Sequence, residues 1–259
     1  MNPLNILWTI LALLGAYLSG SIPYSVIIGK VATGEDLRDY NVGNPGGFNA
    51  VMTYGYFIGF SVIFIDILKG LIPMILIDQL FFRLDTFVAA DGSNIWHTIA
   101  CILGPAFCIL GHNHPVWLKF KGGRGTAVFI GTLLYVNPIV LMTFFIPFGL
   151  MIGLLKVPTR VSNILSGIFF IPAGLFIPIA PPYNFIHTDW LLPAGAANPF
   201  LYMTPFFITL AMWLAWIPRH FPSLVAAIKG EEWTMSITEG QQITEDFDTI
   251  TIEEEVEEK

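Results

Sequence analysis

The chain has 259 residues, of which 54% are hydrophobic and 12% charged, and its mean hydropathy is +0.68. About a quarter of the residues of an average soluble domain are charged, so this composition excludes an ordinary soluble protein and predicts an integral membrane protein. The net charge of −7 comes from the end of the chain, because residues 231–259 hold 11 of the 19 acidic residues and one of the 12 basic residues. We therefore expect a membrane domain over residues 1–230 and an acidic, disordered cytoplasmic tail over residues 231–259.

Apolar segments follow one another along the chain, and a helix needs roughly 20 residues to cross a bilayer. They fall at about residues 3–28, 51–77, 95–112, 126–137, 139–156, 160–180 and 200–217. The fourth is short and ends at Asn137-Pro138, so it also fits a half-helix or a tight hairpin with the fifth. The expected fold is all-α, with about seven transmembrane helices.

The basic residues indicate the orientation of these helices. Nine of them lie in alternate connections or in the C-terminal segment, while the opposite connections carry only Arg83. Because positively charged loops stay in the cytoplasm, the N-terminus is expected outside and the C-terminus inside. The nine are Lys30, Arg38, Lys119, Lys121, Arg124, Lys156, Arg160, Arg219 and Lys229.

Two patterns of small residues bear on packing. The spacings Gly55/Gly59 and Gly149/Gly153 predict close approach of helices. Cys101 and Cys108 lie seven residues apart in one apolar segment, roughly 10 Å apart on a helix and beyond the reach of a disulfide. We expect both to be buried free thiols.

Residues 118–131, LKFKGGRGTAVFIG, combine glycines and cations at the start of an apolar run. Consecutive glycines allow backbone N–H groups to converge on an oxyanion, and a following helix start adds partial positive charge. Lys121 and Arg124 would neutralise the ligand. The spacing is not that of a P-loop, so the prediction is a phosphate site of another kind. The alternative is a positively charged loop whose glycines only form turns.

A second glycine-rich loop, DLRDYNVGNPGGFNAV (residues 36–51), is expected on the same side of the membrane. Gly43 permits a tight turn, and the amide groups of Asn44 and Asn49 could donate hydrogen bonds to a second anion. The alternative is a turn-rich loop whose asparagines cap the next helix. Two such loops on one face make a shared site more credible than either loop does alone.

Ionisable residues also occur at membrane depth. Asp66 and Lys69 lie three residues apart on one helix face and can pair. Buried charges in membranes are costly and indicate a functional site, so a purely structural pair and direct ligand contact both remain open. His112, ahead of the glycine-rich loop, is a candidate phosphate donor or acid/base group. No nearby cysteine or carboxylate completes a metal set, so no metal is expected.

Most of residues 12–233 resemble the bacterial acyl-phosphate:glycerol-3-phosphate acyltransferases, the PlsY family. The segments that carry the resemblance are, in order, GSIPYSVIIGK (20–30), GEDLRDYNVGNPGGFNAV (34–51), FIDILKG (64–70), GHNHPVWLKFKGGRGTA (111–127), TRVSNILSG (159–167), and RH with a following GEE (219, 220 and 230–232).

The resemblance implies a seven-span enzyme of the bacterial plasma membrane that acts in phospholipid biosynthesis. It implies transfer of a fatty acyl group from acyl phosphate to the 1-hydroxyl of sn-glycerol 3-phosphate, at the cytoplasmic face, without a cofactor or a nucleic-acid partner. An acyl phosphate is already activated, so catalysis can rest on holding two phosphorylated molecules together and neutralising their charge. The acyl chain would enter laterally from the bilayer.

The resemblance also assigns roles to residues. Those it implies for catalysis are Lys121, His220 and Asn49. Those it implies for binding phosphate or substrate are Gly122, Gly123, Arg124, Gly125, Gly43, Asn44, Arg38, His112, Lys69 and Arg219. Asp66 and Glu232 would support the site structurally.

The chain departs from the family at two motifs. The usual first motif, G-S-G-N-P-G-A-T-N followed by an arginine, has Val42 for its serine and Met52 at the arginine position. The usual third motif, R-H-R-E-N, has Ser223 for its asparagine. Each missing charge-assisted hydrogen bond is worth roughly 1.5–3 kcal/mol. Two alternatives therefore stand beside the acyltransferase: a paralogue of the same fold with another acceptor, and an inactive lipid- or phosphate-binding membrane protein.

Overall fold

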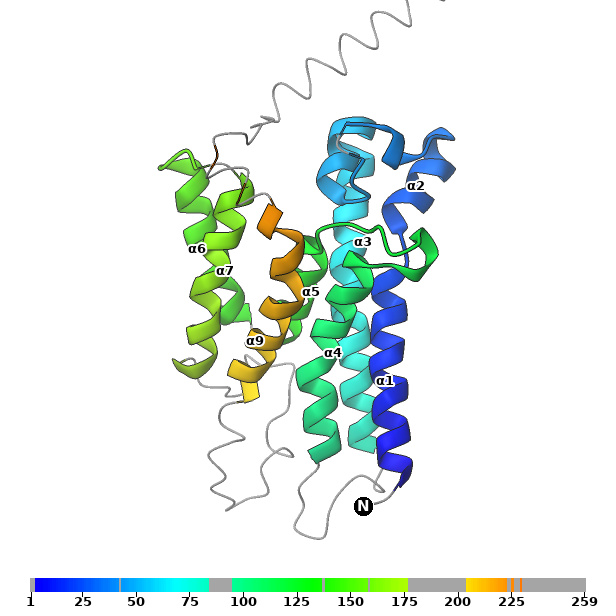
Figure 1. Cartoon of the computed structure of the whole chain (residues 1–259), viewed down its shortest axis with the longest axis vertical. Helices are drawn as coiled ribbons and strands as arrows, with labels where there is room; N and C mark the ends of the chain where they lie inside the picture. The colour runs from blue at the N-terminus through cyan, green and yellow to red at the C-terminus, as the bar shows by residue number, and fades with distance from the viewer. Residues whose placement is uncertain are drawn as a thin grey trace, which may run out of the picture.

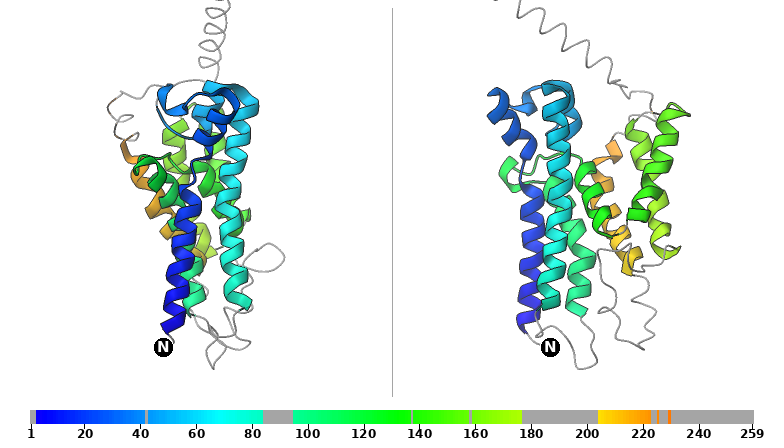
Figure 2. Two further views of the ribbon diagram at one scale, coloured as in Figure 1. Left: turned by 90° about the vertical axis from the view of Figure 1, so that its right-hand side faces the viewer. Right: turned by 180° about the vertical axis from the view of Figure 1, so that it is seen from behind.

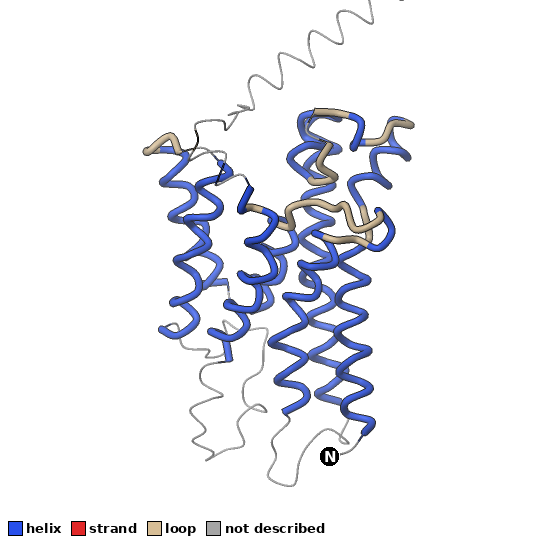
Figure 3. The backbone as a smooth tube through the Cα atoms, in the orientation of Figure 1, coloured by secondary structure: helices blue, strands red, loops and turns tan. Residues whose placement is uncertain are grey.

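The computed structural model describes residues 3–41, 43–83, 95–136, 138–157, 159–176, 204–222, 225 and 229. Within these ranges the chain is helical apart from short loops, which confirms the all-α expectation for the described part (Figures 1 and 3). The helices are α1 (Pro3–Ser21), α2 (Tyr24–Thr33), α3 (Gly47–Arg83), α4 (Ile95–Asn113), α5 (Thr126–Val136), α6 (Pro138–Gly153), α7 (Thr159–Phe176) and α9 (Thr204–Trp216), with 3-10 turns η1 (Leu37–Asp39), η3 (Val116–Leu118) and η5 (Ile217–Arg219).

Three helical segments are long and apolar enough to cross a membrane: Leu4–Thr33, Gly47–Ile77 and Thr98–Leu118. Four shorter apolar helical segments follow, Thr126–Val136, Pro138–Gly153, Val161–Ala173 and Phe206–Arg219. The acidic tail lies outside the described residues. The number of spans and the sides on which the termini lie stay predictions.

Two of the expected apolar segments are interrupted. In the first, α1 ends at Ser21 and α2 starts at Tyr24, because Pro23 has non-helical backbone angles and lacks an N–H group. In the second, Gly55 (φ 79°, ψ 177°) breaks α3. The expectation of single helices over residues 3–28 and 51–77 is therefore wrong at these two points.

The break at Gly55 folds α3 into a helical hairpin. A Cβ atom added to Gly59 would lie 2.4 Å from the Cα of Val51, and one added to Gly47 would lie 2.3 Å from Ile63. These contacts show that the piece before Gly55 packs antiparallel on the piece after it. Gly59 thus serves helix packing as expected, whereas Gly55 serves a turn that requires positive φ.

The helices form two groups joined by α5 and α9. In Figures 1 and 2, α1, α3 and α4 lie side by side at one edge of the molecule, and α6 and α7 lie at the other. Glycines allow backbones to touch where α1 meets α4: a Cβ on Gly20 would lie 2.0 Å from the carbonyl oxygen of Cys108. The rings of Phe129, Phe144 and Trp216 form the buried junction of α5, α6 and α9, with 5.0 Å between the centroids of Phe129 and Trp216.

Two further expectations about packing have different outcomes. Cys101 and Cys108 are free and buried, as expected. The Gly149/Gly153 spacing on α6 does not serve packing within the described part of the chain, since a Cβ added at either glycine would meet nothing within 4 Å.

Candidate phosphate-binding site

The glycine-rich loop, residues 119–125, connects η3 to α5 and turns back onto the end of α4. The N–H of Gly122 donates to the carbonyl of Asn113, and the N–H of Gly123 donates to the carbonyl of His112, both at 3.2 Å. These two N–H groups are therefore not directed at a ligand. The expectation that they form an anion nest is wrong, because they satisfy carbonyls that the end of α4 leaves without helical partners.

The same close approach explains why the loop needs its glycines. A Cβ on Gly122 would lie 2.2 Å from the carbonyl oxygen of His112, and one on Gly123 would lie 2.2 Å from the Nε2 atom of His112. Gly125 has φ +79°, and a Cβ there would lie 2.6 Å from Oδ1 of Asn113. The glycines let the loop lie directly on α4.

Two features of this loop remain suited to an anion. The first helix-closing bond of α5 runs from the N–H of Phe129 to the carbonyl of Gly125, so the N–H groups of the first turn begin directly after the loop. The side chain of Lys121 is exposed, and its ammonium group forms no hydrogen bond or ion pair with any described residue. The loop therefore brings together the positive potential of a helix start and the ammonium group of Lys121, which is unpaired among the described residues.

Arg219 and His220 hold the loop from the other side. The guanidinium of Arg219 donates from Nε to the carbonyl of Gly123 at 3.2 Å and from Nη2 to the carbonyl of Gly122. His220 lies 3.2 Å through Nε2 from the carbonyl of Arg124, and its ring contacts the ring of Trp216 in a tilted arrangement with 4.0 Å between centroids. Three consecutive loop carbonyls are thus bound by two adjacent residues at the end of η5, which follows α9.

The partner of His220 also determines its tautomer. A carbonyl oxygen only accepts hydrogen bonds, so Nε2 carries the proton and Nδ1 does not. His220 is 1% exposed, and this burial lowers its pKa to about 3. His220 is therefore neutral and contributes position, not positive charge, to the loop.

The buried neutral His220 makes stability depend on pH. Its folded pKa lies below the unfolded value of about 6.5, so the stabilisation is complete above about pH 6.5 and decreases as the pH falls below it, by up to about 1.4 kcal/mol per pH unit. We expect the melting temperature of the wild type to fall more steeply than that of His220→Gln between about pH 7 and about pH 5. If the melting temperatures of the two proteins fell equally with pH, the result would contradict this assignment.

The two bonds from Arg219 require a planar fork. Lysine carries the same charge on a single ammonium group and cannot reproduce both bonds. We expect Arg219→Lys to lower kcat about tenfold and to raise hydrogen–deuterium exchange at residues 119–125, and we expect Arg219→Gln to do no better. A Lys variant with wild-type turnover and exchange would show that charge alone is needed at this position.

The second predicted loop is organised around Asn49, which is 3% exposed. Its Nδ2 donates to the carbonyls of Leu37 (3.2 Å) and Asn44 (3.0 Å), and also lies 3.4 Å from that of Tyr40. Its Oδ1 accepts from Nδ2 of Asn41 at 3.0 Å. The expectation that the amide of Asn49 donates to an anion is wrong, because its hydrogens already satisfy backbone carbonyls of its own loop.

Two other residues of this loop have backbone roles. Gly43 has φ +62°, and its N–H donates to the carbonyl of Tyr40 at 2.9 Å, so it closes a turn. Asn44 supplies the carbonyl that Asn49 binds. Met52, at the position where the family has an arginine, is 8% exposed and is part of the interior.

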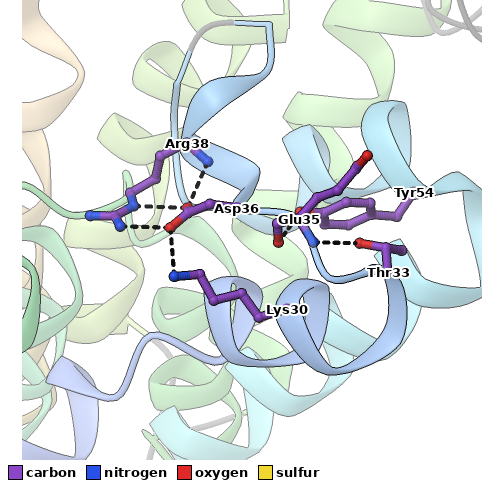
Figure 4. A network of polar contacts seen from close by, with 6 residues as sticks. All are labelled: Lys30, Thr33, Glu35, Asp36, Arg38 and Tyr54. Atoms are coloured by element: carbon purple, nitrogen blue, oxygen red, sulfur yellow. Dashed lines mark hydrogen bonds and ion pairs between the residues drawn. The ribbon is translucent and has the colours of Figure 1, made fainter.

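Arg38 is bound by an acidic neighbour (Figure 4). Its Nε and Nη2 donate to the two carboxylate oxygens of Asp36 at 2.9 and 2.7 Å, and Nζ of Lys30 lies 3.2 Å from the same carboxylate. The hydrogen bonds from Arg38 hold the pKa of Asp36 well below its usual range. One ionised carboxylate thus compensates part of the positive charge of Arg38 and Lys30.

The predicted pairing of Asp66 with Lys69 is confirmed. Nζ of Lys69 lies 2.9 Å from Oδ1 of Asp66, both side chains are buried, and the same Nζ donates to the carbonyl of Ile22 at 2.9 Å. The ring of Tyr24 is 5.7 Å away. The ammonium group is thus held between α1 and α3 by one charge and one carbonyl.

The described residues form two clusters from the predicted set. His112, the glycine-rich loop, Arg219 and His220 are in contact, whereas the hydrogen bonds of the Asn49 side chain stay within residues 37–44. Glu232 lies outside the described residues.

The prediction missed Asn113, which joins the first cluster. It is fully buried, its Nδ2 donates to the carbonyl of Ala215 at 3.2 Å, and its own carbonyl accepts from Gly122. Its place between two histidines at the end of α4 was the available signal.

This arrangement defines a helical membrane protein with two glycine-rich polar loops where its apolar helices end. The chain matches the family model "Glycerol-3-phosphate acyltransferase" over residues 10–230. It is 33% identical to a glycerol-3-phosphate acyltransferase of Staphylococcus haemolyticus (strain JCSC1435) over 224 residues, which are 86% of this chain and 96% of that protein. The protein of the same description from Staphylococcus aureus (strain Newman) is 37% identical over 169 residues, 65% of this chain and 80% of that protein.

Solved structures agree with these relatives. The crystal structure of PlsY (YgiH), an integral membrane glycerol 3-phosphate acyltransferase, in its glycerol 3-phosphate form has a TM-score of 0.64, with 26% identity over 89% of this chain and 97% of that chain. The lysophosphatidic acid form of PlsY shares the fold, with a TM-score of 0.63 and 24% identity over 90% of this chain and 98% of that chain. The chain belongs to the glycerol-3-phosphate acyltransferase family.

Proposed function

We propose that this protein transfers a fatty acyl group from acyl phosphate to the 1-hydroxyl of sn-glycerol 3-phosphate, forming lysophosphatidate and inorganic phosphate for phospholipid biosynthesis. Family membership supports the acceptor. The observation that carries the site is the glycine-rich loop, which Arg219 and His220 hold by three carbonyls while Lys121 stays unpaired among the described residues.

The reaction suits these residues. The acceptor hydroxyl oxygen attacks the acyl carbonyl carbon, a new C–O bond forms, and the C–O bond to the phosphate breaks with its electron pair on the leaving phosphate. The departing phosphate can take the hydroxyl proton, so no protein nucleophile is required. Lys121 and the first turn of α5 would stabilise the negative charge of the phosphate groups as the bond breaks. Arg219 and His220 act as positioning residues through the loop carbonyls.

The remaining roles follow from the two clusters. Asn49 and Gly43 would support substrate binding by fixing the shape of residues 37–44 rather than by touching a phosphate. Arg38, in the loop around Asn49, and Arg124, in the glycine-rich loop, would supply positive charge, and His112 would support the backbone of the glycine-rich loop. Asn44 contributes to the loop around Asn49 through its carbonyl, and Gly125 ends the glycine-rich loop of residues 119–125.

We also propose the topology that the charges predict. Seven spans would place the N-terminus outside and the C-terminus in the cytoplasm of a bacterial plasma membrane, with the site at the cytoplasmic face. Residues 1–230 would form the membrane domain and residues 231–259 a separate acidic tail. Cysteine labelling from either side of intact cells, at one position in residues 34–46 and one in residues 231–259, would react only from the cytoplasmic side.

The function is tested with purified protein, a long-chain acyl phosphate and labelled glycerol 3-phosphate. We expect labelled lysophosphatidate and one phosphate released per product, and no product when acyl-coenzyme A replaces acyl phosphate. Acyl phosphate consumption only with other acceptors would favour the paralogue. Absence of any turnover, with phosphate still raising the melting temperature, would favour a binding protein.

A further inference from the structure

A cavity of about 480 Å³ lies between α1 and α3. Small residues of α1, such as Ala12, Gly15 and Ala16, form one wall, and apolar residues of α3, such as Ile72 and Leu76, form the other. Its polar lining consists of Ser19, Tyr24 and Lys69. The cavity is therefore apolar over most of its length and polar at one end, where the ammonium group of Lys69 is paired with Asp66.

The direction of the two helices places these polar residues together. Figure 2 shows α1 and α3 side by side along their length. Ser19 follows Ala12 by seven residues on α1, and Lys69 precedes Leu76 by seven on α3, which is roughly 10 Å along each helix. Nζ of Lys69 donates to the carbonyl of Ile22, just beyond the end of α1, so the polar residues lie at that end of the cavity.

This polar end adjoins the first turn of α5, which follows the glycine-rich loop. Gly70, directly after Lys69, lies so close to α5 that a Cβ there would be 2.4 Å from the carbonyl oxygen of Val128. Val128 is in the first turn of α5, which follows the loop. On α1, the hydroxyl of Tyr17 donates to the carbonyl of His114 at 2.6 Å. The polar end of the cavity therefore neighbours the start of α5 and the residue that follows α4.

The cavity also opens sideways. Ile72 and Leu76 line it, yet they are 47% and 63% exposed, so its wall on α3 faces the surroundings of the helices. In a membrane those surroundings are lipid chains. A lipid-borne substrate could therefore enter without leaving the bilayer.

Gly15 occupies a special place on this wall. It is a helical residue without positive φ, and a Cβ added to it would meet nothing within 4 Å. Gly20, on the same helix, allows α1 to touch α4, but Gly15 permits no such contact. A glycine inside a helix costs about 1 kcal/mol relative to alanine. What the missing side chain provides here is open space in the cavity.

We propose that the cavity between α1 and α3 holds the acyl chain of the donor, and that Gly15 sets the length of the chain that the enzyme accepts. The inference rests on the proposed function, because it takes the acyl donor from that reaction. The charged head group would lie at the Ser19, Tyr24 and Lys69 end, and a longer chain would have to pass Gly15.

The test compares Gly15→Leu with Gly149→Leu. Both glycines lie in apolar helices with open space around them, but Gly149 on α6 does not line the cavity. Turnover is measured with saturated acyl phosphates of increasing length. We expect the ratio of kcat/KM for the longest donor to that for the shortest to fall at least about tenfold in Gly15→Leu, less in Gly15→Ala, and not at all in Gly149→Leu. An unchanged ratio in Gly15→Leu would overturn the inference.

A binding measurement separates this inference from the proposed function. Unreactive acyl phosphonates of the same lengths are added, and the melting temperature is recorded. We expect the long phosphonate to stabilise the wild type and Gly149→Leu more than Gly15→Leu, even if no lysophosphatidate forms. Equal stabilisation of all three proteins would place the acyl chain elsewhere, whatever the outcome of the activity assay.

Discussion

Replacing Lys121 with alanine is expected to lower kcat/KM for acyl transfer by about 10- to 100-fold while leaving the melting temperature nearly unchanged. A charge-assisted hydrogen bond to a phosphate is worth roughly 1.5–3 kcal/mol, which corresponds to this loss of rate. The fold should not suffer, because the Lys121 side chain is exposed and binds no described residue.

Lys119 provides the matched control. It lies two residues earlier in the same loop and is also exposed, but it comes before the turn that brings the chain onto α4. We expect Lys119→Ala to keep turnover within about twofold, as is usual for exposed charges whose pairing is weak. Equal losses in the two variants would mean that the loop acts through its overall charge. Unchanged turnover in Lys121→Ala would remove this residue from the site.

Replacing Gly122 with alanine is expected to destabilise the protein and to remove most activity. The added Cβ would lie 2.2 Å from the carbonyl oxygen of His112 and 2.2 Å from Cδ of Pro115, and neither can move without the end of α4. Such overpacking costs about 1–3 kcal/mol, and a displacement of catalytic groups by about 1 Å can cost about 100-fold in rate.

The melting temperature and kcat of Gly122→Ala are compared with those of Gly149→Ala, where the new Cβ meets nothing within 4 Å. We expect the control to match the wild type in both measurements. A Gly122→Ala protein as stable and as active as the control would show that the loop does not lie on α4 in the working enzyme.

The membrane helices, one ion pair and the family of this protein can be predicted from local sequence. Apolar runs of helical length predict membrane helices because an unpaired backbone is too costly in lipid. The three-residue spacing of Asp66 and Lys69 predicts their ion pair because helix geometry puts both on one face, and the structure has Nζ and Oδ1 2.9 Å apart. The order of the polar segments identifies the family, which the comparisons confirm.

The detailed roles of the site residues depend on contacts that local sequence does not contain. Glycines and asparagines in a loop fit an anion site and a packed turn equally well. Only the fold shows that the N–H groups of Gly122 and Gly123 bind the end of α4 and that Asn49 binds its own loop. The break at Gly55 likewise becomes visible only when Val51 lies against Gly59.

The sequence by itself therefore determined the membrane class, the helical content, the family and the position of the polar loops. The tertiary structure decided which polar groups already form hydrogen bonds within the protein and which remain available to a ligand. Arg219 reaches Gly123 across 96 residues, and its fork binds loop carbonyls rather than pointing to an anion. The reason is that a hydrogen-bonding group shows its type in the sequence, but its partner is chosen by the packing of helices that lie far apart in the chain.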